Sequence, residues 1–287
     1  MRTYKSQDGH QVCEQFADLY EFLDTIEERP VNKTFANKYG AQIECQPSHD
    51  GREEFRGTAS WAESCSLMER GYEEGVNMIL NAGVKPQGGT LQRYETAVVG
   101  FAPCIPNAIM GLPDSMIRSR EQKQVQHEVT VFYMLGASCD VEKEDIARAS
   151  RRLLDAVVSL EQQHTRVRLV LLSATTAKTS SNEYLRIVSM TLKEARQALN
   201  LRKLSYPLVH PSFFRRQVFA WIETAPGIPS RYSHGHGYQA KDYEVRNFLT
   251  DQRIMQKTDY FISTSTLMSL SSGDDVITYF NRQSKQS

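Results

Sequence analysis

The sequence lacks any long hydrophobic segment. No apolar run approaches the roughly 18 residues of a membrane-spanning helix. The first residues, MRTYKSQDGHQ, have no apolar core behind their basic residues, as a secretory signal would. We therefore expect no membrane partner and a protein that stays in the cytoplasm in which it is made.

Cysteine is scarce and has no recognisable pairing pattern. Five cysteines, Cys13, Cys45, Cys65, Cys104 and Cys139, are scattered along the chain, and none belongs to a C-x-x-C pair. An odd, scattered set argues against a disulfide framework and a structural zinc site. The sequence predicts reduced thiols that are mostly buried.

The sequence also lacks an excess of either charge. The 34 Lys and Arg residues balance 34 Asp and Glu residues, which gives a formal net charge of zero. Proteins that bind nucleic acid through their whole surface usually carry an excess of positive charge. Nucleic-acid binding is therefore expected only if a local basic patch supports it.

Complete catalytic motifs are missing as well. The chain contains no G-x-S-x-G, no Walker-type G-x-x-x-x-G-K, no H-E-x-x-H, and no G-x-G-x-x-G after a strand. The sequence favours a protein without a catalytic site and without a cofactor, and it names no catalytic residue.

The first part of the chain has the pattern of helices. Apolar residues recur at helical spacing from Phe16 to Ile26, and Ser60 with Glu63 forms a capping box before a helix that is expected to reach about Ala82. Residues 1–92 are predicted to form a mostly helical region packed on the core. Two prolines among apolar residues make 105–113 an irregular but buried connection.

Residues 93–287 have the pattern of an α/β domain. Residues 129–135 are apolar on both faces, as in a central strand covered by helices. A helix with an acidic start leads to a second buried strand, and a short polar turn makes the next strand antiparallel, at or near a sheet edge. The expected strands are 96–101, 129–135, 167–172, 184–192 and 260–266, and the later helices begin at Ser212 and at Ser272 or Asp274.

This order of elements resembles the von Willebrand factor A-type arrangement, a Rossmann-like mixed sheet with helices on both faces. The resemblance implies a metal site at the end of the first strand, built on Asp-x-Ser-x-Ser. The matching turn, Gly136 to Asp140, keeps Ser138 but lacks the leading carboxylate. Ser138, Asp140 and Asp274 are thus candidate residues of a degenerate sheet-top site, or simple helix caps.

Two longer strings resemble an uncharacterised family of tailed-bacteriophage proteins. They run from Pro106 to Pro113 and from Ser205 to Arg216, with Phe219 and Glu223 beyond. The resemblance covers about residues 95–224 and implies a phage-encoded protein in the bacterial host cytoplasm or in the virion. It supplies no activity and no catalytic residues.

Residues 196–216 form a basic segment without Asp or Glu. Tyr206, Phe213 and Phe214 are interleaved with its cations, which suits phosphate binding and base stacking, although the aromatic residues could equally belong to the core. The candidate nucleic-acid-binding residues are Arg196, Arg202, Lys203, Arg215 and Arg216.

His234 and His236 are separated by one glycine and lie near Asp242, which permits a metal-binding interpretation. No third ligand is identifiable, and two histidines in a surface loop are the simpler explanation. A metal-dependent hydrolase at this loop is the least favoured hypothesis.

The leading hypothesis is a non-enzymatic phage protein that binds a phage or host protein, through the sheet-top loops and the N-terminal region, in assembly or in interference with the host. The alternative is a nucleic-acid-binding protein of phage replication or recombination that uses residues 196–216. The sequence leaves the oligomeric state open.

Overall fold

The computed structural model describes residues 1–29, 34–36, 42–44, 56–81, 94–119, 127–136, 143–163, 165–178, 182–225 and 238–286. The chain forms two compact units. Unit 1 combines Met1–Lys85 with Glu128–Ser287, and unit 2 is Pro86–His127. The expected boundary between residues 92 and 93 differs from this division, because unit 2 interrupts unit 1 in sequence.

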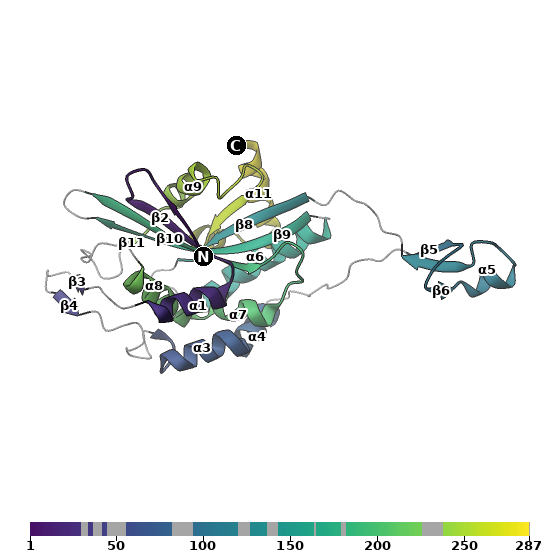
Figure 1. Ribbon diagram of the computed structural model, residues 1–287, viewed down its shortest axis with the longest axis horizontal. Coiled ribbons are helices and arrows are strands. Elements are labelled where there is room, and N and C mark those ends of the chain that lie inside the picture. Colours follow the sequence, from purple (N-terminus) through teal and green to yellow (C-terminus); the bar gives the residue numbers. More distant parts are fainter. Residues whose placement is uncertain are drawn as a thin grey trace. The chain divides into compact units, whose positions relative to one another are not determined.

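Unit 1 is a mixed α/β structure in which helices flank one main sheet (Figure 1). Its strands lie in the order β1-β2-β10-β9-β8-β12, and β11 pairs with β9. The strands are β1 (Arg2–Lys5), β2 (Gln11–Phe16), β8 (His127–Met134), β9 (Thr165–Lys178), β10 (Glu183–Lys193), β11 (Tyr238–Gln239) and β12 (Tyr260–Ser263). A separate hairpin pairs β3 (Thr34–Ala36) with β4 (Gln42–Glu44).

Helices cover both faces of this sheet. They are α1 (Leu19–Glu28), α3 (Trp61–Arg70), α4 (Glu73–Asn81), α6 (Lys143–Gln162), α7 (Leu201–Val209), the π-helix η1 (Phe213–Val218), α8 (Phe219–Thr224), α9 (Asp242–Asp251), α10 (Thr264–Ser269) and α11 (Gly273–Gln286). None of the helices in the described ranges has the length and apolar composition of a membrane span.

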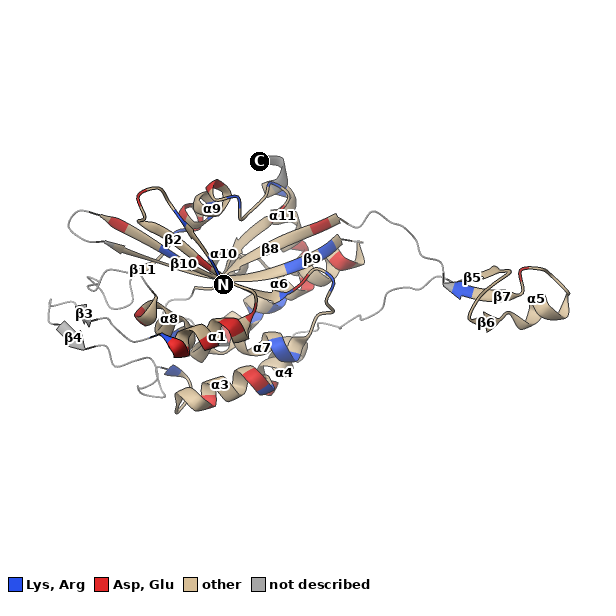
Figure 2. Cartoon of the chain, in the orientation of Figure 1, with Lys and Arg blue, Asp and Glu red and all other residues tan. Residues whose placement is uncertain are grey.

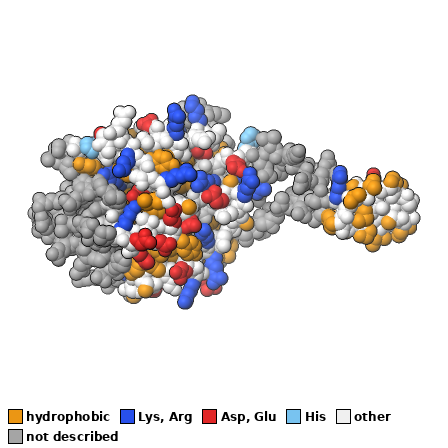
Figure 3. All heavy atoms as spheres, in the orientation of Figure 1, with side chains coloured by type: hydrophobic (Ala, Val, Ile, Leu, Met, Phe, Trp, Pro, Cys, Tyr) orange, Lys and Arg blue, Asp and Glu red, His pale blue; other side chains and the backbone are white. Residues whose placement is uncertain are grey.

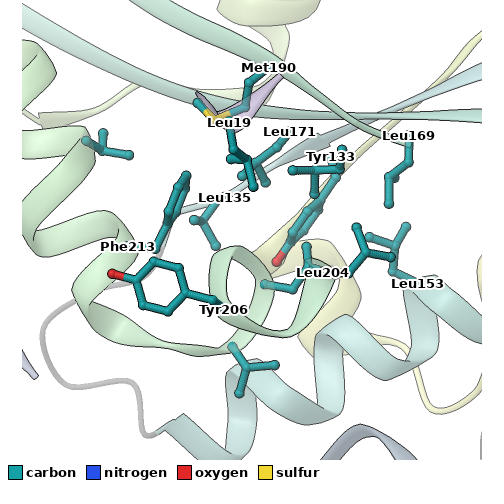
Figure 4. Close-up of a cluster of buried hydrophobic side chains, with 14 of the residues drawn as sticks. Leu19, Tyr133, Leu135, Leu153, Leu169, Leu171, Met190, Leu204, Tyr206 and Phe213 are labelled. Carbon is teal, nitrogen blue, oxygen red and sulfur yellow. The ribbon is translucent and has the colours of Figure 1, made fainter. Parts of the chain in front are cut away.

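Alternation along β9 creates two hydrophobic clusters. Leu169 and Leu171 belong to the larger one, with α1, α6, α7 and α8, whereas Val170 and Leu172 belong to the smaller one, with α9. Figure 4 shows the larger cluster, where Tyr133, Leu171 and Met190 of the sheet lie near Leu153 and Phe213 of the helices. The sequence was therefore right about a sheet with helices on both faces.

The prediction that β10 lies near a sheet edge was wrong. β10 is antiparallel to β9, as expected, but its other side pairs in parallel with β2, and β1 extends the sheet further. The N-terminal residues therefore contribute strands as well as helices. The sequence pattern did not predict strand β2, because the buried carboxylate of Glu14 interrupts the apolar pattern of the strand.

Partners on two helices make the burial of Glu14 tolerable. Both terminal nitrogens of Arg29 donate to its carboxylate, each over 2.9 Å, and the Trp221 indole nitrogen donates over 2.7 Å. A buried carboxylate is stable only when charge and hydrogen-bond partners replace water. This network fixes β2 against α1 and α8.

The predicted N-cap at Ser60 is confirmed, but the return bond of the capping box goes to Ala59 instead of Ser60, and the helix after it is shorter than predicted. The Glu63 backbone N–H donates to the Ser60 hydroxyl over 3.1 Å, and the Glu63 carboxylate accepts from the Ala59 N–H over 2.7 Å. Gly71 then breaks the run into α3 and α4 with a φ of 87°. A side chain at Gly71 would also collide with the backbone of Arg202.

Unit 2 is a small three-stranded antiparallel sheet with one short helix. Its strands β5 (Tyr94–Ala97), β7 (Met116–Ser119) and β6 (Ala102–Pro103) lie in that order, and α5 (Ile105–Ile109) connects β6 to the turn before β7. The predicted strand at 96–101 thus begins and ends earlier. Residues 105–113 were expected to be buried, and this prediction was wrong: none of them is buried.

Candidate functional site

Strands β8 and β12 end side by side at one edge of the main sheet. They are parallel, and Ser263 at the end of β12 lies opposite Met134 of β8. Strand β9, which follows β8 through α6, lies on the other side of β8. Ligand crevices in α/β proteins form where the strand order switches in this way. This edge is therefore the first candidate site.

A hydroxyl-rich cluster occupies the edge. The Ser263 hydroxyl donates to the Asp242 carboxylate over 2.6 Å and lies 2.9 Å from the Ser265 hydroxyl. It also accepts from the Thr266 backbone N–H over 3.3 Å, which caps α10. The cluster thus links the start of α9 to the end of β12.

Thr264 connects the same edge to β8. Its hydroxyl lies 2.9 Å from the Tyr133 hydroxyl, donates to the Met134 carbonyl over 3.2 Å and accepts from the Gly136 N–H over 3.3 Å. Burial raises the pKa of Tyr133, so that its phenol stays protonated near neutral pH. Thr264 therefore holds the ends of β8 and β12 together.

The chemistry of this cluster is structural in the described part of the chain. Its hydroxyls cap α10 or bridge strands, and among the described residues no hydrogen bond joins them to a histidine that could act as a base for a serine nucleophile. No group of three or more His, Cys, Asp or Glu side chains that could hold a metal ion occurs among the described residues. The cluster provides neither a nucleophile–base pair nor a complete ligand set.

Four of the predicted metal-site residues, Ser138, Asp140, His234 and His236, lie outside the described residues. Their predicted roles stay predictions.

Asp274 is exposed in the first turn of α11. The capping bonds belong to its neighbour: the Asp275 carboxylate accepts from the Ser272 N–H over 3.1 Å, and the Asp275 N–H donates back to the Ser272 hydroxyl over 3.2 Å. Ser272 therefore opens this helix, which is one of the two predicted starts.

The structure buries one of the predicted nucleic-acid-binding residues. Arg216 has no exposed surface, and its guanidinium donates to the Thr58 hydroxyl over 2.7 Å and to the Thr58 carbonyl. Ser212 bonds the same segment, since its hydroxyl donates to the Arg56 carbonyl over 2.6 Å. Arg216 thus fixes residues 56–58 against η1 and cannot meet a phosphate at the surface.

The other four cations lie in three separate segments of the chain. Figure 2 shows Lys and Arg residues dispersed over many helices and strands, with Asp and Glu residues among them. Arg196 follows β10 and faces Glu128 at 3.5 Å, Arg202 and Lys203 begin α7, and Arg215 lies in η1. The Arg202 side chain donates to the Arg70 carbonyl over 2.8 Å. The sequence had grouped these residues by proximity along the chain, but the structure does not gather them on one element.

The aromatic residues of the basic segment belong to the core. Tyr206 and Phe213 are completely buried, and the Tyr206 hydroxyl donates to Gln217, whose amide donates to Ser64, each bond measuring 2.9 Å. Phe214 packs edge-on against Phe219. The core interpretation of these aromatic residues is therefore confirmed.

The second candidate site is the apolar surface of unit 2, which we define as residues 98–112. Seven of the twelve large apolar side chains that are exposed in the described ranges lie there. They are Val98, Val99, Phe101, Ile105, Ile109, Met110 and Leu112. Figure 3 shows apolar side chains covering most of the visible face of this unit.

Backbone hydrogen bonds hold this surface in shape. The Phe101 N–H donates to the Ile117 carbonyl over 2.9 Å, and the Cys104 N–H donates to the Ser115 carbonyl over 2.7 Å. Gly100 allows the close approach, because a side chain there would collide with the Ile117 carbonyl. Unit 2 is thus an ordered scaffold that presents apolar side chains to solvent.

The family described as a domain of unknown function, DUF7192, has a model that matches residues 3–286. No curated protein and no solved structure matches the chain. The match spans both units, so that unit 2 is part of the family domain.

Proposed function

Given that the chain belongs to the DUF7192 family, whose function is unknown, we propose that it is a non-enzymatic binding protein that contacts another protein through the apolar surface of unit 2. The observation that carries this proposal is the concentration of exposed apolar side chains in residues 98–112. Contiguous apolar patches of this kind mark interaction surfaces in soluble proteins.

The exposure values make this surface unlike ordinary scattered surface residues. Val99 is 78% exposed and Ile109 is 80% exposed, whereas Trp221 in the core of unit 1 is 1% exposed. Burying one such side chain contributes about 1.5–3 kcal/mol. A partner that covers several of them gains enough free energy for specific binding.

The proposed setting is a phage-encoded protein of the bacterial host cytoplasm or the virion, active in assembly or in interference with the host. The resemblance of 106–113 and 205–216 to tailed-bacteriophage proteins supports it. The first of these strings overlaps the apolar surface at residues 106–112, and the second runs from α7 into η1 of unit 1. The proposed contact therefore includes one of the two segments that suggest the family.

We also propose that unit 1 is a von Willebrand factor A-like domain with a degenerate metal site. The order β10-β9-β8-β12, with β10 antiparallel to β9, supports this assignment. The hairpin of β1 and β2 extends such a sheet. Calorimetric titration with Mg²⁺ or Mn²⁺ tests the degenerate site: tight binding that Ser138→Ala abolishes would contradict it.

The binding proposal is tested with a photo-reactive phenylalanine analogue at residue 109 in the full-length protein. The matched control carries the same analogue at Tyr20, which is 45% exposed on α1 of unit 1. Illumination during expression in the host should give protein adducts at position 109 that position 20 does not give. Val99→Asp in the same chain should remove them, whereas equal adducts at the two positions, or none at 109, would contradict the proposal.

The nucleic-acid alternative keeps Arg196, Arg202, Lys203 and Arg215 as candidate contacts, since Arg216 is buried. Filter binding at low and high salt tests it, because phosphate contacts weaken steeply as salt rises. Binding at low salt that an Arg202→Ala, Arg215→Ala double variant reduces would favour this alternative over the binding proposal.

A further inference from the structure

We propose that the apolar surface of unit 2 packs against the same surface of a second copy of this chain, in a two-fold symmetric dimer. The inference rests on the proposed function, in which residues 98–112 are a protein contact, and it identifies the partner. Three observations on the described residues support it.

The first observation is that the described part of unit 2 has no buried core of its own. Not one residue from Thr96 to Arg118 is buried. Isolated units of about 40 residues or fewer usually need a metal, disulfides or association to become stable. Packing against another apolar surface would supply the burial that the three strands and α5 lack.

The second observation concerns which apolar surface is available on this chain. Outside residues 98–112, only five large apolar side chains are exposed in the described ranges: Met1, Tyr20, Leu80, Tyr238 and Tyr243. They belong to the N-terminus, α1, α4, β11 and α9, so they form no contiguous run in sequence or on one element. Among the described residues, the surface that best matches the apolar surface of unit 2 is therefore the same surface on a second copy of the chain.

The third observation is charge. The sequence has no Asp, Glu, Lys or Arg from Val98 to Pro113. In a two-fold contact each residue lies near its own copy, so any single charged residue close to the axis would face a like charge. An uncharged surface avoids this repulsion, and association through it should depend little on salt.

Sedimentation velocity on the full-length protein tests the inference. We expect the protein to sediment as a dimer at a protein concentration of about 50 µM, which exceeds a dissociation constant in the low micromolar range. The sedimentation coefficient should be the same at low and high salt. The double variant Val99→Asp, Ile109→Asp should weaken self-association at least about 100-fold, because each copy then buries carboxylates against those of its partner. Tyr20→Asp, which places a carboxylate at an exposed position in the first turn of α1, should leave the dimer unchanged.

A mixing experiment separates loss of contact from loss of folding. The variant Val99→Lys, Ile109→Lys should also be monomeric alone, whereas an equimolar mixture with the Asp variant should form a heterodimer, because opposite charges then meet across the two-fold axis. A monomeric wild-type protein, or variants that still form dimers, would overturn the inference. If the wild type is monomeric and position 109 still gives adducts with another protein, the proposed function stands and only the identity of the partner changes.

Discussion

The two units of this chain use apolar residues in opposite ways. Unit 1 encloses them in two clusters on either side of its sheet and buries even charged residues such as Glu14 and Arg216 with dedicated partners. Unit 2 exposes them on a scaffold closed by backbone hydrogen bonds. The difference teaches that apolar content alone does not identify a core: what matters is whether other elements of the same chain cover it.

The largest difference between the units should be in stability. Trp221→Ala removes a buried indole and its bond to Glu14, which should lower the free energy of unfolding by about 3–5 kcal/mol. Ile109→Ala on the exposed surface of unit 2 should change it by less than about 0.5 kcal/mol at a protein concentration low enough to dissociate the proposed dimer. Urea denaturation of both full-length variants measures the two changes. Similar losses of unfolding free energy would mean that Ile109 is also packed in a hydrophobic core.

Thiol reactivity should also separate the units. Burial raises the pKa of Cys65 in α3 to about 11 and raises the pKa of the fully buried Cys13, whereas Cys104 of unit 2 is only partly buried. At pH 8 a shift from 9.0 to about 11 leaves roughly 100-fold less thiolate at Cys65. Alkylation followed by mass spectrometry should modify Cys104 first, then Cys65, and Cys13 only after unfolding.

The Cys65 shift has a consequence for pH stability. The unfolded chain releases this proton first, so stability should be complete below pH 9 and fall as the pH rises towards about 11. Cys65→Ala should make the fall in unfolding free energy shallower over that range. An unchanged pH profile would contradict the assignment.

Arg216 tests whether unit 1 buries its charges for structural reasons. Arg216→Met should lower the unfolding free energy by about 2 kcal/mol, because it removes the guanidinium that donates to the Thr58 carbonyl and hydroxyl, of which the hydroxyl keeps Ser212 as a partner. Arg196→Met, which alters a side chain that is 89% exposed, should cost no more than about 0.5 kcal/mol. A larger loss of unfolding free energy in Arg196→Met than in Arg216→Met would contradict the burial of Arg216 and support its predicted role in phosphate binding.

The smallest contrast concerns helix caps. Asp275→Ala removes the partner of Ser272 at the start of α11 and should cost about 1 kcal/mol, whereas the exposed Asp274→Ala should be nearly neutral. In unit 2, the side chain of Cys104 makes no capping bond to α5, so Cys104→Ala should not change stability through the cap. Thermal unfolding of the three variants measures the order.

Regular periodicity predicted the parts of the fold that obey it. The apolar run at 129–135 and the amphipathic pattern after it identified β8 and α6, and Ser60 with Glu63 identified the start of α3. The sequence did not predict strand β2, because the burial of Glu14 depends on hydrogen bonds from Arg29 and Trp221, which belong to other parts of the sequence. A pattern of single residues cannot reveal a buried charge whose partner comes from another element.

The candidate sites were less predictable for the same reason. Burial separated Arg216 from the neighbouring Arg215, although the two are identical in type and adjacent in sequence. Residues 105–113 were predicted to form a buried connection because they are apolar, but none of them is buried in the structure. The apolar composition of a segment predicts that its burial is favourable, but it does not predict which surface buries the segment.

The position of unit 2 in the sequence has an evolutionary consequence. It is inserted between α4 and β8, whereas the strand neighbours of β8 come from residues beyond 164. Substitutions, insertions or losses in residues 86–126 therefore involve no strand of the main sheet. The unit for which we propose a binding role can therefore vary in sequence separately from the unit that contains the main core.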